Sequence, residues 1–180
     1  MTTFSTPCRE PLPAIAEVNA KSDHEAVATL RVLFEAAPVL EQYIVSLRPW
    51  LSYEDVIDRS QAFVEDLMRQ ERLADVLSIV NAHPAIGADP AKLSADSKIE
   101  QGAAGDPQVL ARLAELNRQY EAKFGFRFVI FVNGRPKDVI LGVLESRMNN
   151  SPREEMQTAA RAMMDIARDR LRKRKQQTKL

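Results

Sequence analysis

The sequence holds few residues of the kinds that build disulfides, metal sites and phosphate-binding loops. Of its 180 residues, one is cysteine (Cys8), two are histidine (His24 and His83) and six are glycine. A single cysteine excludes an internal disulfide and suggests a reducing compartment. A catalytic zinc ion needs about three protein ligands, and no local cluster supplies them. We therefore expect no metal site, and no phosphate loop because no glycine-rich turn precedes a helix.

An excess of charge of one sign is also missing. Lysine plus arginine and aspartate plus glutamate each total 25, so the net charge is zero. A nucleic-acid-binding protein needs net or clustered positive charge to displace counterions, so we expect no nucleic-acid partner. No apolar run approaches the roughly 20 residues of a membrane span, and the N-terminus lacks the basic-then-apolar order of a secretory signal. We therefore expect no membrane partner.

What the sequence does contain is helical periodicity. Hydrophobic residues make up 45% and charged residues 28%, the balance of a globular protein with one core. Ser22 and Glu25 have the spacing of a capping box, and Asp106-Pro107 is a helix start signal. Apolar residues at spacings of three and four follow it up to Gly125, which should stop that helix. These patterns predict an all-α fold.

The chain divides into one domain with short ends. Residues 1–13 carry three prolines and no periodicity, so we interpret them as a flexible N-terminal arm. Residues 14–175 form a single-domain helical bundle, and residues 176–180 form a C-terminal tail. No repeat or linker interrupts the domain.

One strand-like run stands out among the helices. Residues 126–132 are mostly aromatic or β-branched, and the run ends at the turn pair Asn133-Gly134. No second long run could pair with it. The run is therefore either part of a very small sheet or an extended segment threaded beside the active site. Backbone groups of a buried extended segment need partners, and a ligand can supply them.

His83 is the candidate for proton chemistry near neutral pH. It follows an apolar helical pattern that ends near Val80, and Pro84 places it on a bend just past the helix end. The structural alternative is a helix C-terminal cap, in which the ring covers free carbonyls.

Other polar candidates are less distinctive by themselves. Ser97, Glu100 and Gln101 share one side of a short helix, a pattern typical of a solvated helix face. Arg170 opens the basic run 170–175 near the end of the last helix. Cations suit a helix C-terminus, so the run favours a solvated helix end over a binding patch.

The combination of motifs is more informative. His83-Pro84, Ser97-x-x-Glu100-Gln101, the block Lys-Phe-Gly-Phe-x-Phe-Val-Ile that ends at Ile130, and a closing Ile-Ala-Arg-x-Arg170-Leu occur in order. In this order and spacing, between about residues 18 and 172, the sequence resembles the 2-oxo-4-hydroxy-4-carboxy-5-ureidoimidazoline (OHCU) decarboxylases of urate degradation. The sequence departs from the family pattern at Arg127, where proline is common, and just after Pro84.

The resemblance implies a fold, a reaction and a site. Family members are all-helical, need no metal or organic cofactor and are often homodimers. They convert a small ureidoimidazoline to S-allantoin and carbon dioxide. The resemblance implies that His83 is the acid/base residue and that Glu100 orients the substrate and can also hold the imidazole and set its charge. The substrate-binding residues that it implies are Pro84, Ser97, Gln101, Phe128, Val129, Ile130, Phe131, Val132 and Arg170.

Two other functions remain open at this point. One is a non-catalytic helical interaction module, with His83 as a cap and the motifs as core packing. The other is a helical hydrolase of the same pathway, in which His83 and Glu100 act on water. The last three residues, Thr178-Lys179-Leu180, resemble the Ser-Lys-Leu peroxisomal address, so we expect a peroxisomal protein, with the cytoplasm as the alternative.

Overall fold

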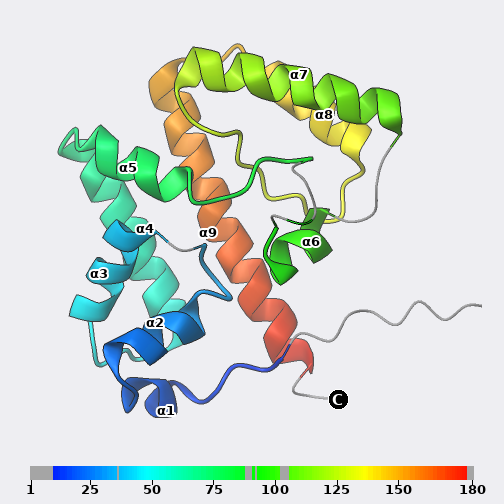
Figure 1. Cartoon of the computed structure of the whole chain (residues 1–180). Coiled ribbons are helices and arrows are strands. Elements are labelled where there is room, and N and C mark those ends of the chain that lie inside the picture. Colours follow the sequence, from blue (N-terminus) through cyan, green and yellow to red (C-terminus); the bar gives the residue numbers. More distant parts are fainter. Residues whose placement is uncertain (1–9, 36, 88–90, 92, 102–105, 178–180) are drawn as a thin grey trace, which may run out of the picture.

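The computed structural model describes residues 10–35, 37–87, 91, 93–101 and 106–177. These residues form nine helices and no strand, which confirms the all-α prediction (Figure 1). Within the same ranges, no helix has the length and apolar character needed to cross a membrane. The helices are α1 (Ile15–Asn19), α2 (Asp23–Leu30), α3 (Pro38–Ser46), α4 (Tyr53–Arg69), α5 (Leu73–Val80), α6 (Ala95–Gln101), α7 (Pro107–Phe124), α8 (Lys137–Arg147) and α9 (Pro152–Gln177).

Helix ends lie where the local signals predict them. At the start of α2, the Ser22 side chain accepts from the backbone of Glu25, and the Glu25 carboxylate accepts from the backbone of Ser22. Asp106 caps α7 by accepting from the amide of Gln108 at 2.7 Å. Gly125 ends α7 with a φ of 78°, a left-handed conformation that glycine adopts without steric cost.

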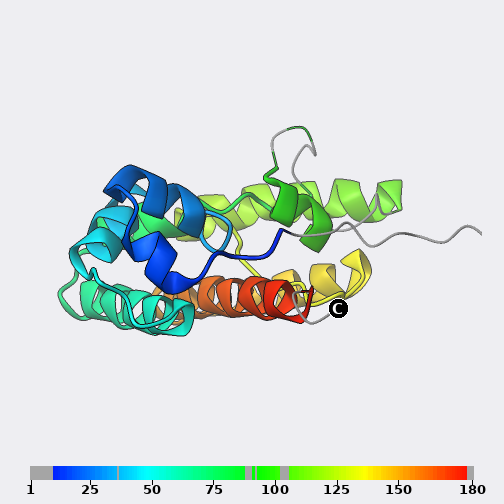
Figure 2. The same ribbon diagram turned by 90° about the horizontal axis from the view of Figure 1, so that it is seen from below.

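The long helix α9 organises the molecule. It crosses the whole structure, and α4 packs along it (Figure 1). Viewed from below, α4 and α9 lie in one layer, with α2, α3 and α6 in the layer above them (Figure 2). Helices α7 and α8 lie side by side at the end where α9 begins. The core therefore lies between two helical layers. Helix α9 runs from the end of the molecule that holds α7 and α8 to the opposite end (Figure 1).

The strand-like run is a threaded segment. Residues 126–132 leave α7, run back across the interior and enter α8 without helical or strand hydrogen bonding (Figure 1). Five of these residues are less than one tenth exposed; the most buried are Phe126, Phe128 and Val129. Of the two possibilities, the threaded segment is the one that the structure shows. Side chains take the place of a partner strand: Asn81 accepts from the amide of Arg127, and Arg147 and Arg135 donate to the carbonyls of Val129 and Phe131.

The ends of the chain are described only in part. Residues 1–9 and 178–180 lie outside the described residues, so the arm and the Thr178-Lys179-Leu180 address remain predictions there. Within the last part of the predicted arm, Leu12 packs against the core and the carbonyl of Pro13 accepts from the Tyr53 hydroxyl at 2.8 Å. The contacts of the fold therefore begin just before α1.

The basic end of α9 differs from the sequence-based interpretation. Arg170 is only 1% exposed, and Arg174 is also buried. Arg174 forms a two-pronged ion pair with Asp96 on α6, at 2.8 and 3.1 Å. A solvated helix end is therefore wrong for these two arginines. The physical reason is that they lie four residues apart, on the face of α9 that α6 covers.

Candidate active site

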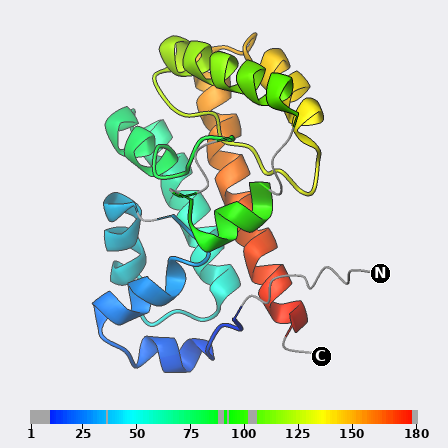
Figure 3. The ribbon, with the colours of Figure 1, turned by 45° about the vertical axis from the view of Figure 1, so that its right-hand side comes forward.

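One cavity is lined by the catalytic and substrate-binding residues that the sequence analysis predicts. Its walls come from the loop after α5, from α6, from the extended segment and from α9, which converge in the middle of the molecule (Figure 3). Two apolar residues not named above, Ile86 and Ile166, complete it. The lining residues are His83, Pro84, Ile86, Ser97, Glu100, Gln101, Phe128, Val129, Ile130, Phe131, Val132, Ile166 and Arg170.

Arg170 is the charged centre of this cavity. Its Nε donates to Glu100 Oε1 at 2.8 Å, and its Nη2 donates to Glu100 Oε2 at 2.9 Å, which makes a bidentate pair. Nη2 also lies 3.1 Å from Glu35 Oε1 and 3.2 Å from the Ser97 hydroxyl. A planar guanidinium can serve several acceptors at fixed angles, which an ammonium cannot do. Arg170 therefore joins α9 to α6 and to the segment after α2.

Glu35 is a residue that the sequence analysis missed. Its carboxylate accepts from Ser97 Oγ at 2.8 Å and from Ser94 Oγ at 3.1 Å, in addition to Arg170. Burial acts to raise the pKa of Glu35, but the charge of Arg170 and the Ser97 hydrogen bond outweigh it, so this pKa is lowered. The sequence signal was a lone acidic residue directly after the apolar pair Leu33-Phe34. Glu35 thus binds the side chains of Arg170 and Ser97, which line the cavity, without lining it itself.

His83 is buried but unpartnered. It lies on the bend after α5 and is 4% exposed, and neither ring nitrogen has a hydrogen-bond partner among the residues that the structure describes. Burial lowers the pKa of His83 to about 4; the positive charge of Arg170 adds to the lowering and Glu35 opposes it. The imidazole is therefore neutral near pH 7. Because the ring covers no carbonyl, the helix-cap alternative is wrong.

The expected hydrogen bond from the imidazole to the Glu100 carboxylate is also absent within the described part of the chain. The Glu100 carboxylate is engaged by the Arg170 guanidinium instead. The carboxylate that acts electrostatically on His83 is Glu35, which raises the pKa of the imidazole. The expectation that Glu100 holds the imidazole is thus corrected: a charged arginine is the stronger partner for a buried carboxylate.

Gln101 fixes the loop that carries His83. Its Nε2 donates to the carbonyl of Ala85 at 3.1 Å, and its Oε1 accepts from the amide of Gly87 at 2.9 Å. Asn117 on α7 donates to the carbonyl of Ile86 at 2.9 Å. The loop is therefore held from α6 and from α7.

Across the described residues, no group of three or more histidine, cysteine, aspartate or glutamate side chains could hold a metal ion.

The chain is similar to known proteins over most of its length. The family model for OHCU decarboxylase matches residues 19–172. The OHCU decarboxylase of Amia calva is 33% identical over 162 residues, which cover 86% of this chain and 90% of that protein. The chain belongs to the OHCU decarboxylase family. The Xenopus laevis family member is also 33% identical, over 78% of this chain and 82% of its own length.

A solved structure shares the fold. A crystal structure of OHCU decarboxylase in the presence of (S)-allantoin has a TM-score of 0.64 at 26% identity, and the match covers 88% of this chain and 99% of that one. The Bacillus subtilis uric acid degradation bifunctional protein PucL is 28% identical over 86% of this chain but only 31% of its own length. The part of that longer protein that is similar to this chain is thus about a third of its length.

Arg127, the departure from the family pattern, has a structural role in this chain. Its backbone amide donates to Asn81 Oδ1 at 3.0 Å. Its side chain donates to the carbonyls of Asn81 at 2.9 Å and His83 at 3.3 Å. These bonds connect the extended segment to the bend that carries His83. A proline at this position would lack the donating amide.

Proposed function

We propose that this chain converts OHCU to (S)-allantoin and carbon dioxide without a cofactor, with His83 as the acid/base residue. As a member of the OHCU decarboxylase family, the chain is a carboxy-lyase. The observation that carries the role of His83 is its unpartnered, neutral imidazole in a cavity beside Arg170. A buried group with a shifted pKa in such a cavity is typical of a catalytic acid or base.

The charges around the cavity support the loss of a carboxylate. Arg170 is already paired with Glu100 and Glu35, and much of the remaining wall is apolar, including Ile86 and Ile166. A substrate carboxylate placed here is stabilised less than it would be in water. Carbon dioxide is neutral and loses nothing by the same surroundings. The site therefore favours the product side of the step in which the carbon–carbon bond breaks.

Proton transfer is the second task of the site. The reaction consumes one proton overall, because a carboxylate leaves as neutral carbon dioxide. The electrons of the broken bond enter the imidazoline ring, and a proton must then reach a ring carbon from one face. A neutral imidazole can accept a proton from the substrate hydroxyl and return it to that carbon, while the proton that the reaction consumes overall comes from solvent and ends on a ring nitrogen. Because His83 lies on one wall of the cavity, delivery from that wall accounts for a single enantiomer.

The direct test supplies the substrate fresh. Urate is oxidised in the presence of the upstream hydrolase, the purified chain is added, and carbon dioxide and allantoin chirality are followed. We expect faster carbon dioxide release and an excess of (S)-allantoin. A non-catalytic interaction module would change neither rate nor chirality, and a hydrolase would consume OHCU without releasing carbon dioxide. Either result would replace the proposal.

Two further parts of the proposal concern the oligomeric state of the protein and its location in the cell. We propose that the protein is a homodimer, which light scattering on the purified chain tests as a mass twice that of one chain. We also propose that residues 178–180 direct it to peroxisomes. Urate oxidation is often peroxisomal, which supports that location over the cytoplasm.

A further inference from the structure

A second buried polar cluster lies outside the cavity, where α7, α8 and α9 meet. Its centre is the carboxylate of Glu155, which is 0% exposed in the first turn of α9. Glu155 accepts from the Tyr120 hydroxyl on α7, from Arg147 Nε at 2.8 Å and from Asn150 Nδ2 at 2.6 Å. A buried carboxylate with this many donors is well compensated. The cluster therefore fixes Arg147, the last residue of α8.

Arg147 reaches from this cluster to the wall of the cavity. Its Nη1 donates to the carbonyl of Val129 at 2.9 Å, and its guanidinium carbon lies 4.6 Å from the centre of the Phe128 ring. Both Val129 and Phe128 line the cavity. One guanidinium thus connects Glu155, which is not a lining residue, to the backbone of the extended segment.

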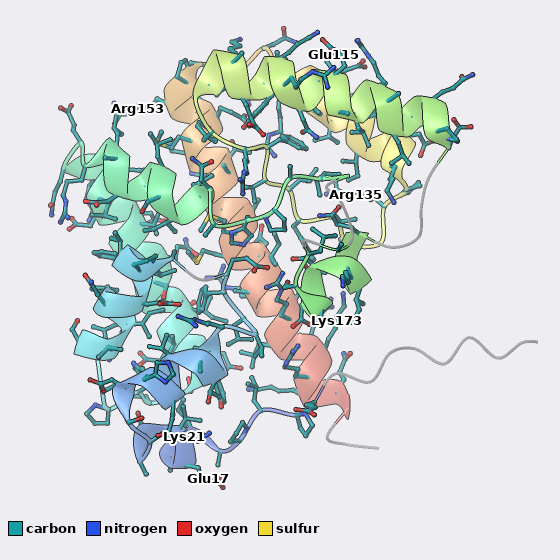
Figure 4. All side chains as sticks on the ribbon, in the orientation of Figure 1. Glu17, Lys21, Glu115, Arg135, Arg153 and Lys173 are labelled. Atoms are coloured by element: carbon teal, nitrogen blue, oxygen red, sulfur yellow. The ribbon has the colours of Figure 1, made fainter. Side chains whose placement is uncertain are left out.

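The direction of these bonds determines which backbone groups face inward. A trans peptide group is planar, so its carbonyl and its N–H point in opposite directions. The carbonyl of Val129 points to Arg147, and the carbonyl of Phe131 accepts from the Arg135 side chain, which lies beside the segment (Figure 4). The amide N–H of Ile130, which shares its peptide group with the Val129 carbonyl, therefore points away from Arg147. Ile130 is a cavity-lining residue.

We propose that Arg147 is a positioning residue of the active site. By holding the carbonyl of Val129 away from the cavity, it turns the amide N–H of Ile130 toward the substrate. Glu155 keeps the guanidinium in place and balances its charge. This role rests on the proposed function, because it assumes that the backbone of the extended segment binds OHCU.

The test compares two changes in the same cluster. Arg147→Lys keeps a positive charge beside Glu155, but one ammonium cannot also serve the Val129 carbonyl with the geometry of the fork. Tyr120→Phe is the matched control: it removes a donor from the same carboxylate and leaves the contact between Arg147 and Val129 intact. Both variants are assayed for KM and kcat with fresh OHCU, and amide hydrogen exchange is measured over residues 126–132.

The two variants should differ in KM and in the rate of amide hydrogen exchange over residues 126–132. We expect Arg147→Lys to raise KM about tenfold, with a smaller change in kcat, and to speed exchange in the segment about tenfold. Tyr120→Phe should leave both quantities within about twofold even where it lowers Tm. A merely structural role for Arg147 would lower Tm without changing KM or exchange in the segment, and that result would overturn the proposal.

Two provisions keep the test decisive. Where Arg147→Lys fails to fold, Glu155→Gln replaces it: this variant removes the charge that holds Arg147 and is judged by the same KM and exchange criteria. Failure of the wild-type chain to consume OHCU would refute the proposed function. The exchange comparison would still show whether Arg147 orders the extended segment.

Discussion

Replacing Arg170 by lysine should damage the fold as well as the reaction. Arg170 is nearly fully buried, and its guanidinium makes two bonds to Glu100 and one each to Glu35 and Ser97. A lysine keeps the charge but has a single nitrogen at its tip. It can approach one carboxylate well and must leave the second one poorly paired inside the protein.

The size of the effect follows from these contacts. A hydrogen bond to a charged group contributes about 1.5–3 kcal/mol, and the lysine loses at least two and recovers about one. We therefore expect the free energy of unfolding to fall by about 3 kcal/mol. For a chain of this length, that corresponds to a fall in Tm of about 6–12 °C. We expect kcat/KM to fall by about 1.5–3 kcal/mol, that is, roughly 10–150-fold.

The assay is urea unfolding and steady-state kinetics on Arg170→Lys beside Arg172→Lys. The side chain of Arg172 is 61% exposed, and its ion pair with Asp169 lies on another face of α9. Arg172→Lys should change the free energy of unfolding by less than about 0.5 kcal/mol and leave kcat/KM unchanged. Equal, small effects of both substitutions would show that the buried guanidinium cluster contributes neither stability nor binding, and would refute this reasoning.

Three other predictions test separate parts of the account. Folding lowers the pKa of His83 from 6.5 to about 4, so between these pH values the unfolded chain binds one more proton than the folded chain. The free energy of unfolding should therefore fall by about 3 kcal/mol as pH drops from 6.5 to 4. Urea unfolding against pH measures this loss, which should be mostly gone in His83→Asn and retained in His24→Asn; an identical pH dependence in all three proteins would contradict it. Glu35→Gln should lower kcat/KM by about tenfold. It should also shift the acid limb of the activity–pH profile to lower pH, because the carboxylate that raises the pKa of His83 is removed. An acid limb at the same pH as in the wild type would show that Glu35 does not act on the imidazole. A fluorescent reporter that ends in residues 171–180 should enter peroxisomes and become diffuse when Leu180 is deleted, and a diffuse signal from the intact reporter would exclude the address.

Much of the local structure could be predicted because its causes are local. The capping box at Ser22, the start at Asp106 and the stop at Gly125 each depend on residues within one turn. The lack of a partner strand for residues 126–132 reduced the possibilities to a very small sheet or a threaded segment, and the structure decides for the threaded segment. Most of the cavity-lining residues could be named only through the family resemblance, because they come from four separate stretches of the chain that no local pattern connects.

The electrostatics of the site could not be predicted in the same way. The partners of Arg170 lie 70 and 135 residues away in the sequence, so its pairing with Glu100 and Glu35 depends on how the helices pack. The basic neighbours of Arg170 suggested a solvated helix end, although its spacing of four from Ile166 and from Arg174 matches a buried face. The neutral state of His83 likewise depends on burial and on Arg170, which no local pattern encodes.

The measurement that tests the central claim most directly is chirality-resolved turnover of fresh OHCU by the wild-type chain and by His83→Asn. Asparagine is similar in size and polar, so the variant should stay folded, as circular dichroism and Tm can show. The account predicts that the wild type releases carbon dioxide and forms (S)-allantoin. It also predicts that His83→Asn is slower by about 10²–10⁴-fold and leaves the racemic product of spontaneous decay. A folded His83→Asn enzyme within about threefold of the wild-type rate, roughly 0.7 kcal/mol, with the same enantiomer in excess, would contradict the account.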